Sequence, residues 1–199
     1  MNVDKIVEVV NSSGLVISPT DTVYGIMGDA LNEDVIRRVY SAKKRSYSKP
    51  LILLMSSVDM IKEYTECISD VEEKLINKFL PGLMTIILKK NEKISSLICN
   101  GGDYVGIRIP DNKDLIDIIN KLGRPVISTS ANISDRDVIT RVDMISDELL
   151  FGIDYVYDGG EINSLSSTII RVVDGKLVIL RRGELVDDIE SYFSKLEKN

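Results

Sequence analysis

The chain has 199 residues, 44% of them hydrophobic and 28% charged, which is the balance of an ordinary globular protein and excludes a disordered or fibrous one. Its 25 basic and 31 acidic side chains give a formal net charge of -6, so the surface repels polyanions and sequence-blind nucleic-acid binding is not expected. Histidine is absent, which excludes Ser-His-Asp and Cys-His nucleophilic systems and removes the commonest zinc ligand. We expect residues 1–199 to form a single domain.

Apolar spacing in the first part of the chain predicts helices that alternate with short buried strands. In chain order we expect a helix at 3–13, strands at 15–17 and 23–26, a helix at 32–42, a basic loop at 43–49 and a strand at 51–55. Gly14 is the expected C-terminal cap of the first helix, and Asn32 is the expected N-terminal cap of the second. Pro50 prevents a helix from continuing into the strand that follows it.

The rest of the chain continues this alternation and adds a hairpin. In order, we expect helices from Ser57 and Ser69, strands at 84–88 and 104–109, a helix at 115–122, a strand at 126–127, a short helix at 143–150, a strand at 155–157, strands at 167–173 and 176–180, and a final helix at 185–196. Ser69 and Glu72 form a capping box, and Asp174-Gly175 is a two-residue hairpin signal. Strands interleaved with helices, together with a hairpin, predict an α/β fold with a mixed parallel and antiparallel sheet.

Cysteine usage and the apolar runs indicate the compartment. Cys67 and Cys99 form no CxxC pair, so we expect reduced thiols that hold neither a metal nor a disulfide framework. The N-terminal segment carries Asp4 and Glu8 within its first apolar stretch, and no run of about 18 apolar residues occurs in the sequence. We therefore expect a cytoplasmic protein without a membrane segment.

Polar and cationic residues gather at the predicted strand ends. The segments 18–22 and 128–132 are rich in hydroxyl groups, the loop 43–49 is basic, and Arg108 and Arg181 lie in or at the end of strands. Open α/β sheets bind ligands where strands end, and hydroxyl, amide and guanidinium groups are the donors that phosphate and carboxylate oxygens require. Burying an arginine is costly unless an anion lies opposite. These features indicate a pocket for an anion.

Each feature also has a plainer interpretation, and the residue types alone leave the choice open. A strand end rich in Ser and Thr is often a solvated loop or a helix cap, and a basic loop is often a solvated face. Arg108 can pair with one of the 31 acidic side chains instead of a ligand. Neither the Walker lysine loop nor the GxGxxG motif is present, so the two common nucleotide cradles are missing.

Short motifs follow one another in a fixed order between residues 15 and 185. They are Pro19-Thr20-Asp21-Thr22-Val23-Tyr24-Gly25, Lys43-x-Arg45-x-x-x-x-Pro50-Leu51, Pro81-Gly82-x-x-Thr85, Val105-Gly106-Ile107-Arg108-Ile109-Pro110, Ser128-Thr129-Ser130-Ala131-Asn132, Ser167-Thr168 and Leu180-Arg181-x-Gly183. With these motifs in this order, the chain resembles the YrdC-like family of threonylcarbamoyl-AMP synthases, in its short single-domain form.

The resemblance implies a twisted mixed sheet with flanking helices around a concave, positively lined cavity. It also implies the condensation of L-threonine, bicarbonate and ATP to threonylcarbamoyl-AMP and pyrophosphate, with Mg²⁺ accompanying ATP and no metal held by the protein itself. A separate transferase complex would then move the threonylcarbamoyl group to adenosine in tRNA, and tRNA binding by this chain would be weak or absent. Such a reaction needs positioning and charge neutralisation more than a titrating base, which suits a chain without histidine.

The resemblance assigns five residues to ATP. Lys43 and Arg45 would hold the phosphates and are the expected catalytic pair, with Arg181 as a third cation on the nucleotide. Ser130 and Asn132, the S-x-N element, would contact the adenylate and its phosphate.

A second group is assigned to threonine. Thr22, Arg108 and Ser128 would bind the amino acid, and Arg108 would fork onto its carboxylate. Ser167 or Thr168 would close the same site. We therefore expect four separate segments to converge on one small substrate.

Several positions depart from the family pattern. Ser46 and Arg182 stand where many members have proline, Tyr104 where threonine is frequent, Val138 where a serine is common, and Leu54 where some members have histidine. These departures concern the adenine and ribose contacts more than the reaction.

The alternative function is a non-catalytic RNA-binding or ribosome-associated relative that keeps the concave basic surface. Lys43 and Asn132 discriminate between the two, because a relative without the chemistry would be free to lose the K-x-R or S-x-N pair. Both pairs are intact, which favours the enzyme.

Overall fold

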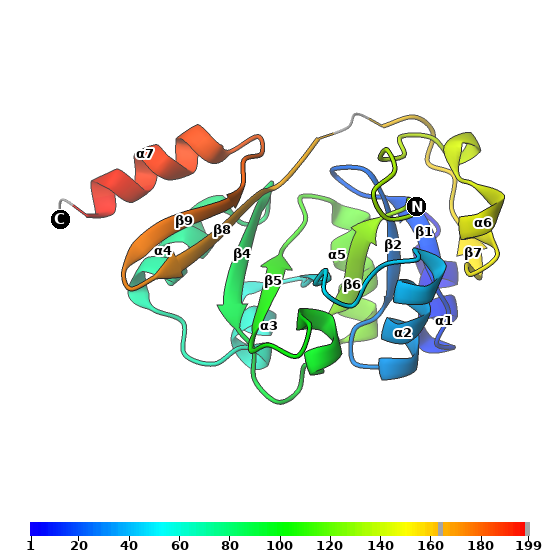
Figure 1. The fold of residues 1–199 in the computed structure, drawn as a ribbon, viewed down its shortest axis with the longest axis horizontal. Helices are drawn as coiled ribbons and strands as arrows, with labels where there is room; N and C mark the ends of the chain where they lie inside the picture. The colour runs from blue at the N-terminus through cyan, green and yellow to red at the C-terminus, as the bar shows by residue number, and fades with distance from the viewer. Residues whose placement is uncertain (163–164, 198–199) are drawn as a thin grey trace.

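The computed structural model describes residues 1–162 and 165–197, and their strands form one mixed nine-stranded sheet that runs from β7 at one edge to β9 at the other (Figure 1). The strands are β1 (Val16–Pro19), β2 (Tyr24–Asp29), β3 (Ile52–Leu54), β4 (Met84–Lys89), β5 (Tyr104–Arg108), β6 (Val126–Ser130), β7 (Tyr155–Val156), β8 (Thr168–Val173) and β9 (Lys176–Arg181). Their order is β7-β1-β2-β6-β3-β5-β4-β8-β9. The pairs β1/β7, β3/β5 and β4/β8 are parallel and the others antiparallel, so the predicted mixed sheet is confirmed.

Helices connect most of these strands, and polar caps define where several of them begin. The helices are α1 (Val3–Asn11), α2 (Glu33–Ala42), α3 (Val58–Tyr64), α4 (Asp70–Phe79), α5 (Lys113–Leu122), α6 (Asp147–Leu150) and α7 (Val186–Leu196), with short 3-10 turns at Ser96–Cys99 and Val142–Met144. The Asn32 side chain accepts hydrogen bonds from the first turn of α2, and Ser69 forms the predicted capping box with Glu72 at the start of α4. Among the helices of the described chain, none combines the length and apolarity that a membrane span requires.

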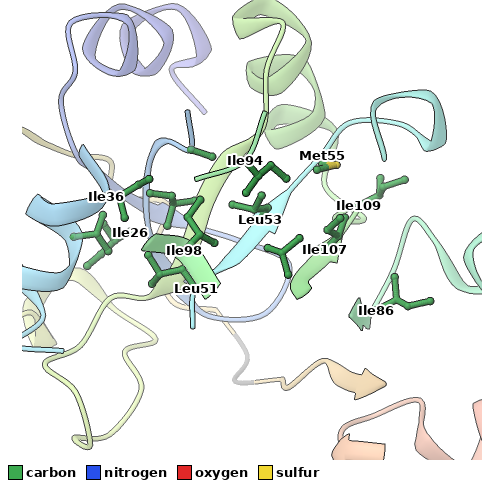
Figure 2. Packing of buried hydrophobic residues seen from close by; sticks show 14 of the residues in the cluster. Ile26, Ile36, Leu51, Leu53, Met55, Ile86, Ile94, Ile98, Ile107 and Ile109 are labelled. Carbon is green, nitrogen blue, oxygen red and sulfur yellow. The ribbon is translucent and has the colours of Figure 1, made fainter. Parts of the chain in front are cut away.

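The central strands send alternate side chains to two apolar clusters. Met27 and Val126 join a cluster with the buried faces of α1 and α5, whereas their chain neighbours Ile26 and Ile127 join a larger cluster with α2, α4 and α7. Figure 2 shows part of the larger cluster, in which Leu53 of β3 lies next to its register partner on β5. Because both faces of β2 and β6 are buried at these positions, adjacent residues are apolar, as in Ile26-Met27 and Val126-Ile127.

Three local differences from the expected elements have identifiable causes. The first helix ends at Asn11, with Ser12 as its C-cap, rather than at residue 13 with Gly14 as its cap, because Ser13 adopts a left-handed φ of 63°. The expected helix at 143–150 is divided, because Ser146 caps a new helix through the Leu149 amide. Strand β6 continues to Ser130, which pairs with Gly25 of β2, so the second hydroxyl-rich segment is largely strand and not loop.

The chain between β7 and β8 crosses from one half of the sheet to the other (Figure 1). The Leu165 amide donates to the Thr22 carbonyl at 3.3 Å, and the Thr168 amide donates to the Leu83 carbonyl at 2.9 Å. These bonds tie the end of the crossing to the β1–β2 turn and to the start of β4. The crossing thereby brings Ser167 to the strand ends that carry the other polar residues.

Candidate functional site

A cavity of about 480 Å³ lies where the crossing meets the polar ends of the central strands. Most of the residues assigned from the sequence line it: Thr22, Arg45, Arg108, Ser128, Ser130, Ser167 and Arg181. Lys43, Asn132 and Thr168 lie outside its lining. Segments far apart in the sequence therefore meet at one cavity, although three of the assigned residues stand behind its wall.

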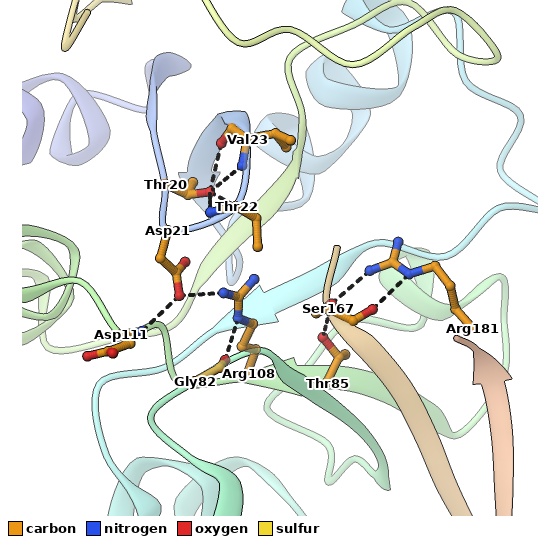
Figure 3. Close-up of polar contacts among 10 residues, drawn as sticks. All are labelled: Thr20, Asp21, Thr22, Val23, Gly82, Thr85, Arg108, Asp111, Ser167 and Arg181. Atoms are coloured by element: carbon orange, nitrogen blue, oxygen red, sulfur yellow. Dashed lines mark hydrogen bonds and ion pairs between the residues drawn. The ribbon is translucent and has the colours of Figure 1, made fainter. Parts of the chain in front are cut away.

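Arg108 ends β5 and is only 5% exposed. Its Nε donates to the Gly82 carbonyl at 2.8 Å, and its Nη2 forms an ion pair with Asp21 (Figure 3). The same Asp21 oxygen accepts a hydrogen bond from the Asp111 amide at 2.9 Å. Burial lowers the pKa of Arg108, and Asp21 opposes that effect. A cation is thus held at the cavity wall with its charge already balanced by one carboxylate.

Arg181 approaches the cavity from the end of β9. Its Nε donates to the Ser167 carbonyl at 3.0 Å, and its Nη2 donates to Ser167 Oγ at 2.7 Å (Figure 3). Ser167 Oγ also lies 2.9 Å from Thr85 Oγ1. Partial burial and, after it, the charge of Arg108 lower the pKa of Arg181. The positive charge of Arg108 thus acts on Arg181, so an anion bound near both guanidinium groups would be favoured.

Arg45 provides a third cation from the loop after α2. Its Nε donates to the Lys49 carbonyl at 3.0 Å, and its Nη2 donates to the Pro50 carbonyl at 2.8 Å. Burial lowers the pKa of Arg45, with Tyr40 and Asp135 acting in the opposite direction. The guanidinium is oriented by neutral carbonyl oxygens, so its charge remains available to a ligand in the cavity.

Lys43 differs from the expectation that it belongs to a basic loop. It is the C-cap residue of α2 and is 1% exposed, because the last turn of the helix directs its side chain under the end of β6. Its ammonium donates to the Ser130 carbonyl, to the Asn132 carbonyl at 2.6 Å and to Asn132 Oδ1 at 3.2 Å. Burial, followed by the charge of Arg45, lowers its pKa to about 7. The ammonium holds chain oxygens directly behind the cavity wall.

The S-x-N element is part of the same buried network. Ser130 Oγ donates to Asn132 Oδ1 at 2.6 Å, and the Asn132 amide group donates to the Arg136 carbonyl. Asn132 is 8% exposed, whereas Ser130 lines the cavity. Ser130 is therefore the member of this pair that a ligand can reach, and Asn132 joins it to Lys43.

The remaining assigned residues divide between wall and core. Ser128 lies on β6 and lines the cavity beside Thr22. Thr168 is fully buried, and its Oγ1 accepts a hydrogen bond from the Leu185 amide at 3.1 Å, which places it under the start of α7. Of the two alternatives at 167–168, the structure thus brings Ser167 to the cavity.

Sequence reasoning missed Asp21, Thr20 and Thr85. The motifs that contain them were recognised, but only Thr22 received a role among these four. Thr85 is fully buried against Ser167, and Asp21 is buried against Arg108. The sequence does place Asp21 as an acidic residue inside a hydroxyl-rich strand end, but that pattern does not by itself select it as the counter-charge of Arg108.

Positions that depart from the family pattern lie partly at the cavity. Leu54 and Val138 line it. Tyr104 is 43% exposed and stacks with Arg171, whose guanidinium carbon lies 3.7 Å from the ring centroid. Arg182 forms exposed ion pairs with acidic residues of α7. The departures at Leu54 and Val138 therefore make part of the wall apolar.

The electrostatics of the wall favour an anionic ligand. Among the described residues that line the cavity, Glu184 is the one carboxylate, against the three guanidinium groups of Arg45, Arg108 and Arg181. Within residues 1–162 and 165–197, no three His, Cys, Asp or Glu side chains are grouped closely enough to hold a metal ion. The donor set suits phosphate and carboxylate oxygens and does not suit a cation held by protein carboxylates.

Known proteins resemble the chain over most of its length. The model of the Sua5/YciO/YrdC family, described as "Telomere recombination", matches residues 8–183. A Methanocaldococcus jannaschii protein, provisionally named a threonylcarbamoyl-AMP synthase, is 43% identical over 178 residues, which cover 88% of this chain and 82% of that protein. A threonylcarbamoyl-AMP synthase of Pyrococcus abyssi is 32% identical over 184 residues, which cover 92% of this chain and 54% of that protein, so the chain spans about half of that relative.

A solved structure agrees with the sequence relatives. The crystal structure of P. abyssi Sua5 complexed with L-threonine matches with a TM-score of 0.89 and 31% sequence identity, over 95% of this chain and 56% of that one. The family model covers far more than half of the chain. The chain belongs to the Sua5/YciO/YrdC family.

Proposed function

We propose that this protein is a threonylcarbamoyl-AMP synthase, which condenses L-threonine, bicarbonate and ATP to threonylcarbamoyl-AMP and pyrophosphate. The observation that carries the proposal is the convergence of Arg45, Arg108 and Arg181 on one cavity of about 480 Å³. That volume is in the range of small-molecule sites. The relatives from M. jannaschii and P. abyssi bear the name of this activity, and P. abyssi Sua5 has been solved with L-threonine bound.

The phosphates of ATP would lie against Arg45 and Arg181. Both guanidinium groups are oriented by neutral oxygens of the chain, so an incoming phosphate does not have to displace a carboxylate from either. Ser130 would contact the nucleotide directly. Lys43 and Asn132 would act from behind the cavity wall: both hold the end of β6, and the Lys43 ammonium adds positive charge beneath the phosphates.

Threonine would bind on the side of Arg108. The guanidinium would take its carboxylate, while Thr22, Ser128 and Ser167 would supply hydroxyl groups around the rest of the molecule. These residues belong to separate strand ends of the same sheet. Their convergence would hold a small zwitterion next to the phosphate site.

The reaction follows from holding the two substrates side by side. The amine nitrogen of threonine bonds to the carbon of bicarbonate, and water leaves, which gives a carbamate. A carbamate oxygen then attacks the α-phosphorus, and the bond to the departing pyrophosphate breaks. The chain would contribute orientation and the guanidinium groups of Arg45 and Arg181, which would stabilise the charge on the leaving pyrophosphate, and no histidine is required.

Mg²⁺ would enter with ATP as part of the substrate. The described residues offer no group of carboxylates for it, so phosphate oxygens and water would be its ligands. We place the reaction in the cytoplasm. A separate transferase complex that acts on tRNA would consume the adenylate, and this chain itself would bind tRNA weakly or not at all.

The direct test incubates the purified protein with ATP, threonine, bicarbonate and magnesium and looks for threonylcarbamoyl-AMP by mass spectrometry. Omission of any one substrate should abolish the product. Arg181→Met, which removes a cation from the wall, should lower the rate by about 10- to 150-fold, the value of a charge-assisted contact. Arg141→Met is the matched control, because Arg141 lies on the surface in an exposed pair with Asp143. An Arg181→Met variant that keeps the rate of the unaltered protein, or no product from the unaltered protein, would contradict the proposal.

A further inference from the structure

The hydroxyl hydrogens of the β1–β2 turn can be assigned from the contacts of Thr20. Its Oγ1 lies 2.7 Å from the Val23 carbonyl oxygen, which has no hydrogen to give, so the single hydroxyl hydrogen of Thr20 must lie between these two atoms. Thr20 Oγ1 also lies 2.8 Å from Thr22 Oγ1. Because the hydrogen of Thr20 is already used, Thr22 must donate its own hydrogen to Thr20.

This assignment fixes what Thr22 offers to the cavity. A hydroxyl group has one hydrogen and two lone pairs, and by this assignment the hydrogen of Thr22 is directed to Thr20 Oγ1, 2.8 Å away. The Thr22 and Val23 amides, at 3.1 and 3.2 Å, share the second lone pair of Thr20 Oγ1 and hold it in place. The side chain of Thr22 therefore faces a ligand as a hydrogen-bond acceptor.

Asp21, the next residue of the turn, acts on Arg108 in a comparable way. The pair is buried, with side-chain exposures of 7% for Arg108 and 11% for Asp21. Nη2 is held by Asp21 and Nε by the Gly82 carbonyl, while Nη1 points away from both (Figure 3). Asp21 is in turn held by the Asp111 amide. The guanidinium is thereby fixed in one orientation, with Nη1 left to a ligand.

We propose that Thr20 and Asp21 are positioning residues that set the hydrogen-bonding pattern of the threonine subsite, Thr20 through Thr22 and Asp21 through Arg108. The inference rests on the proposed function and goes beyond it. Arg108 supplies donors for a carboxylate, and Thr22 supplies an acceptor for an O–H or N–H group on the same molecule. A 2-amino-3-hydroxy acid carries a carboxylate and two such donor groups within a few bonds of each other.

The test measures KM for threonine and for ATP in four variants of the full chain, together with threonine binding by calorimetry. Thr20→Ala and Asp21→Asn should each raise KM for threonine by about tenfold, while KM for ATP stays within about twofold. Thr20→Ser keeps the hydroxyl and should behave as the unaltered protein. Asp143→Asn is the matched acid control, because it breaks an exposed pair with Arg141 away from the cavity.

Whether Asp21→Asn strengthens or weakens threonine binding distinguishes a purely electrostatic role of Asp21 from a positioning role. Loss of the Asp21 carboxylate strengthens the field of Arg108, so a purely electrostatic role predicts tighter binding of the threonine carboxylate. A positioning role predicts weaker binding, because Arg108 is no longer held in its orientation. If Asp21→Asn does not fold, Thr20→Ala carries the test, since it removes no charge.

The donor group on the substrate is found by comparing L-threonine with L-2-aminobutyrate, which lacks the hydroxyl. If Thr22 accepts a hydrogen bond from the substrate hydroxyl, Thr20→Ala reduces the ratio by which the protein binds L-threonine more tightly than L-2-aminobutyrate. If Thr22 accepts a hydrogen bond from the substrate amine, Thr20→Ala weakens the binding of both amino acids by the same factor. Either result supports the inference. Unchanged KM for threonine in folded Thr20→Ala and Asp21→Asn, or an equal rise in KM for ATP, would overturn it. Absence of threonine binding by the unaltered protein would instead overturn the proposed function.

Discussion

Arg108 and Lys43 are both almost completely buried beside the same cavity, yet the chain gives them different partners. Arg108, 5% exposed, forms an ion pair with Asp21. Lys43, 1% exposed, is surrounded by the neutral oxygens of Ser130 and Asn132. A guanidinium stays charged in proteins, whereas a buried ammonium can lose its proton.

The difference separates two ways of preparing a cavity for anions. Asp21 already balances the charge of Arg108 before a ligand binds, so the affinity of a ligand there depends mainly on the geometry of its hydrogen bonds. Elsewhere in the described part of the chain, Lys43, Arg45 and Arg181 have hydrogen bonds to neutral oxygens and no ion pair. A polyanion such as a triphosphate supplies the negative charge that these three cations lack.

The largest expected effect comes from breaking the buried pair. Arg108→Met should lower the free energy of unfolding by about 3–5 kcal/mol, because Asp21 is left as a buried, unpaired charge. The same variant should lose threonine binding. Urea unfolding and calorimetry measure the two effects.

The control is the double variant Arg108→Met with Asp21→Asn. It removes the uncompensated carboxylate, so it should recover part of the lost stability while threonine binding stays lost. A double variant that is less stable than Arg108→Met by the full cost of Asp21→Asn alone would show that the two side chains act independently.

A smaller loss is expected at Lys43. Lys43→Met leaves the Ser130 and Asn132 oxygens without their donor, which should cost about 1–3 kcal/mol of unfolding free energy and lower the rate of adenylate formation. Arg45→Met is the matched comparison, since Arg45 lines the cavity and bonds to carbonyls of its own loop. It should lower the rate by about 10- to 150-fold with a smaller loss of stability. Equal losses of stability in the two variants would contradict the buried role of Lys43.

The depressed pKa of Lys43 predicts two opposite pH trends. Burial lowers this pKa from 10.5 to about 7, so above about pH 7 the folded chain releases a proton that the unfolded chain keeps. The stability of the protein relative to Lys43→Met should therefore rise by about 2 kcal/mol from about pH 7 to about pH 9. ATP favours the charged ammonium, so its affinity should fall over the same range. A Lys43→Met variant that shows the same slopes as the unaltered protein would remove Lys43 as their origin.

The smallest effect concerns tRNA. The cations of the cavity serve a small ligand, and the chain as a whole carries a net charge of -6, so few phosphate contacts are available to a long polyanion. The Kd for tRNA at about 0.15 M salt should be above about 1 µM, and binding should be lost readily as the salt concentration increases. Tight tRNA binding without detectable binding of ATP would favour the non-catalytic RNA-binding relative.

Most elements of the fold could be predicted because their signals are local. The capping box of Ser69 and Glu72 and the Asp174-Gly175 turn each depend on neighbouring residues, and the structure has both. The order of the strands depends on pairing between distant segments. That β6 continues to Ser130 follows from its pairing with Gly25 of β2, which no local pattern reveals.

In the candidate site, too, local features could be predicted from the sequence and contacts between distant segments could not. Arg108 stood out because a charged residue inside an apolar strand needs a partner, but Asp21 lies 87 positions away, so the sequence could not select it among the acidic residues. Lys43 and Arg45 belong to one motif and were given one role. The end of α2 turns the first under β6 and leaves the second at the cavity, and this depends on the helix ending at a particular residue.

The most direct measurement of the central claim follows bicarbonate labelled with heavy carbon into the product. The protein is incubated with ATP, magnesium, threonine and the labelled bicarbonate, and the adenylate and pyrophosphate are quantified together. The proposed function predicts that the label appears in the adenylate and that pyrophosphate forms in equal amount only when threonine is present. Pyrophosphate release without threonine, or an adenylate that carries no label, would contradict the claim that this cavity joins threonine, bicarbonate and ATP.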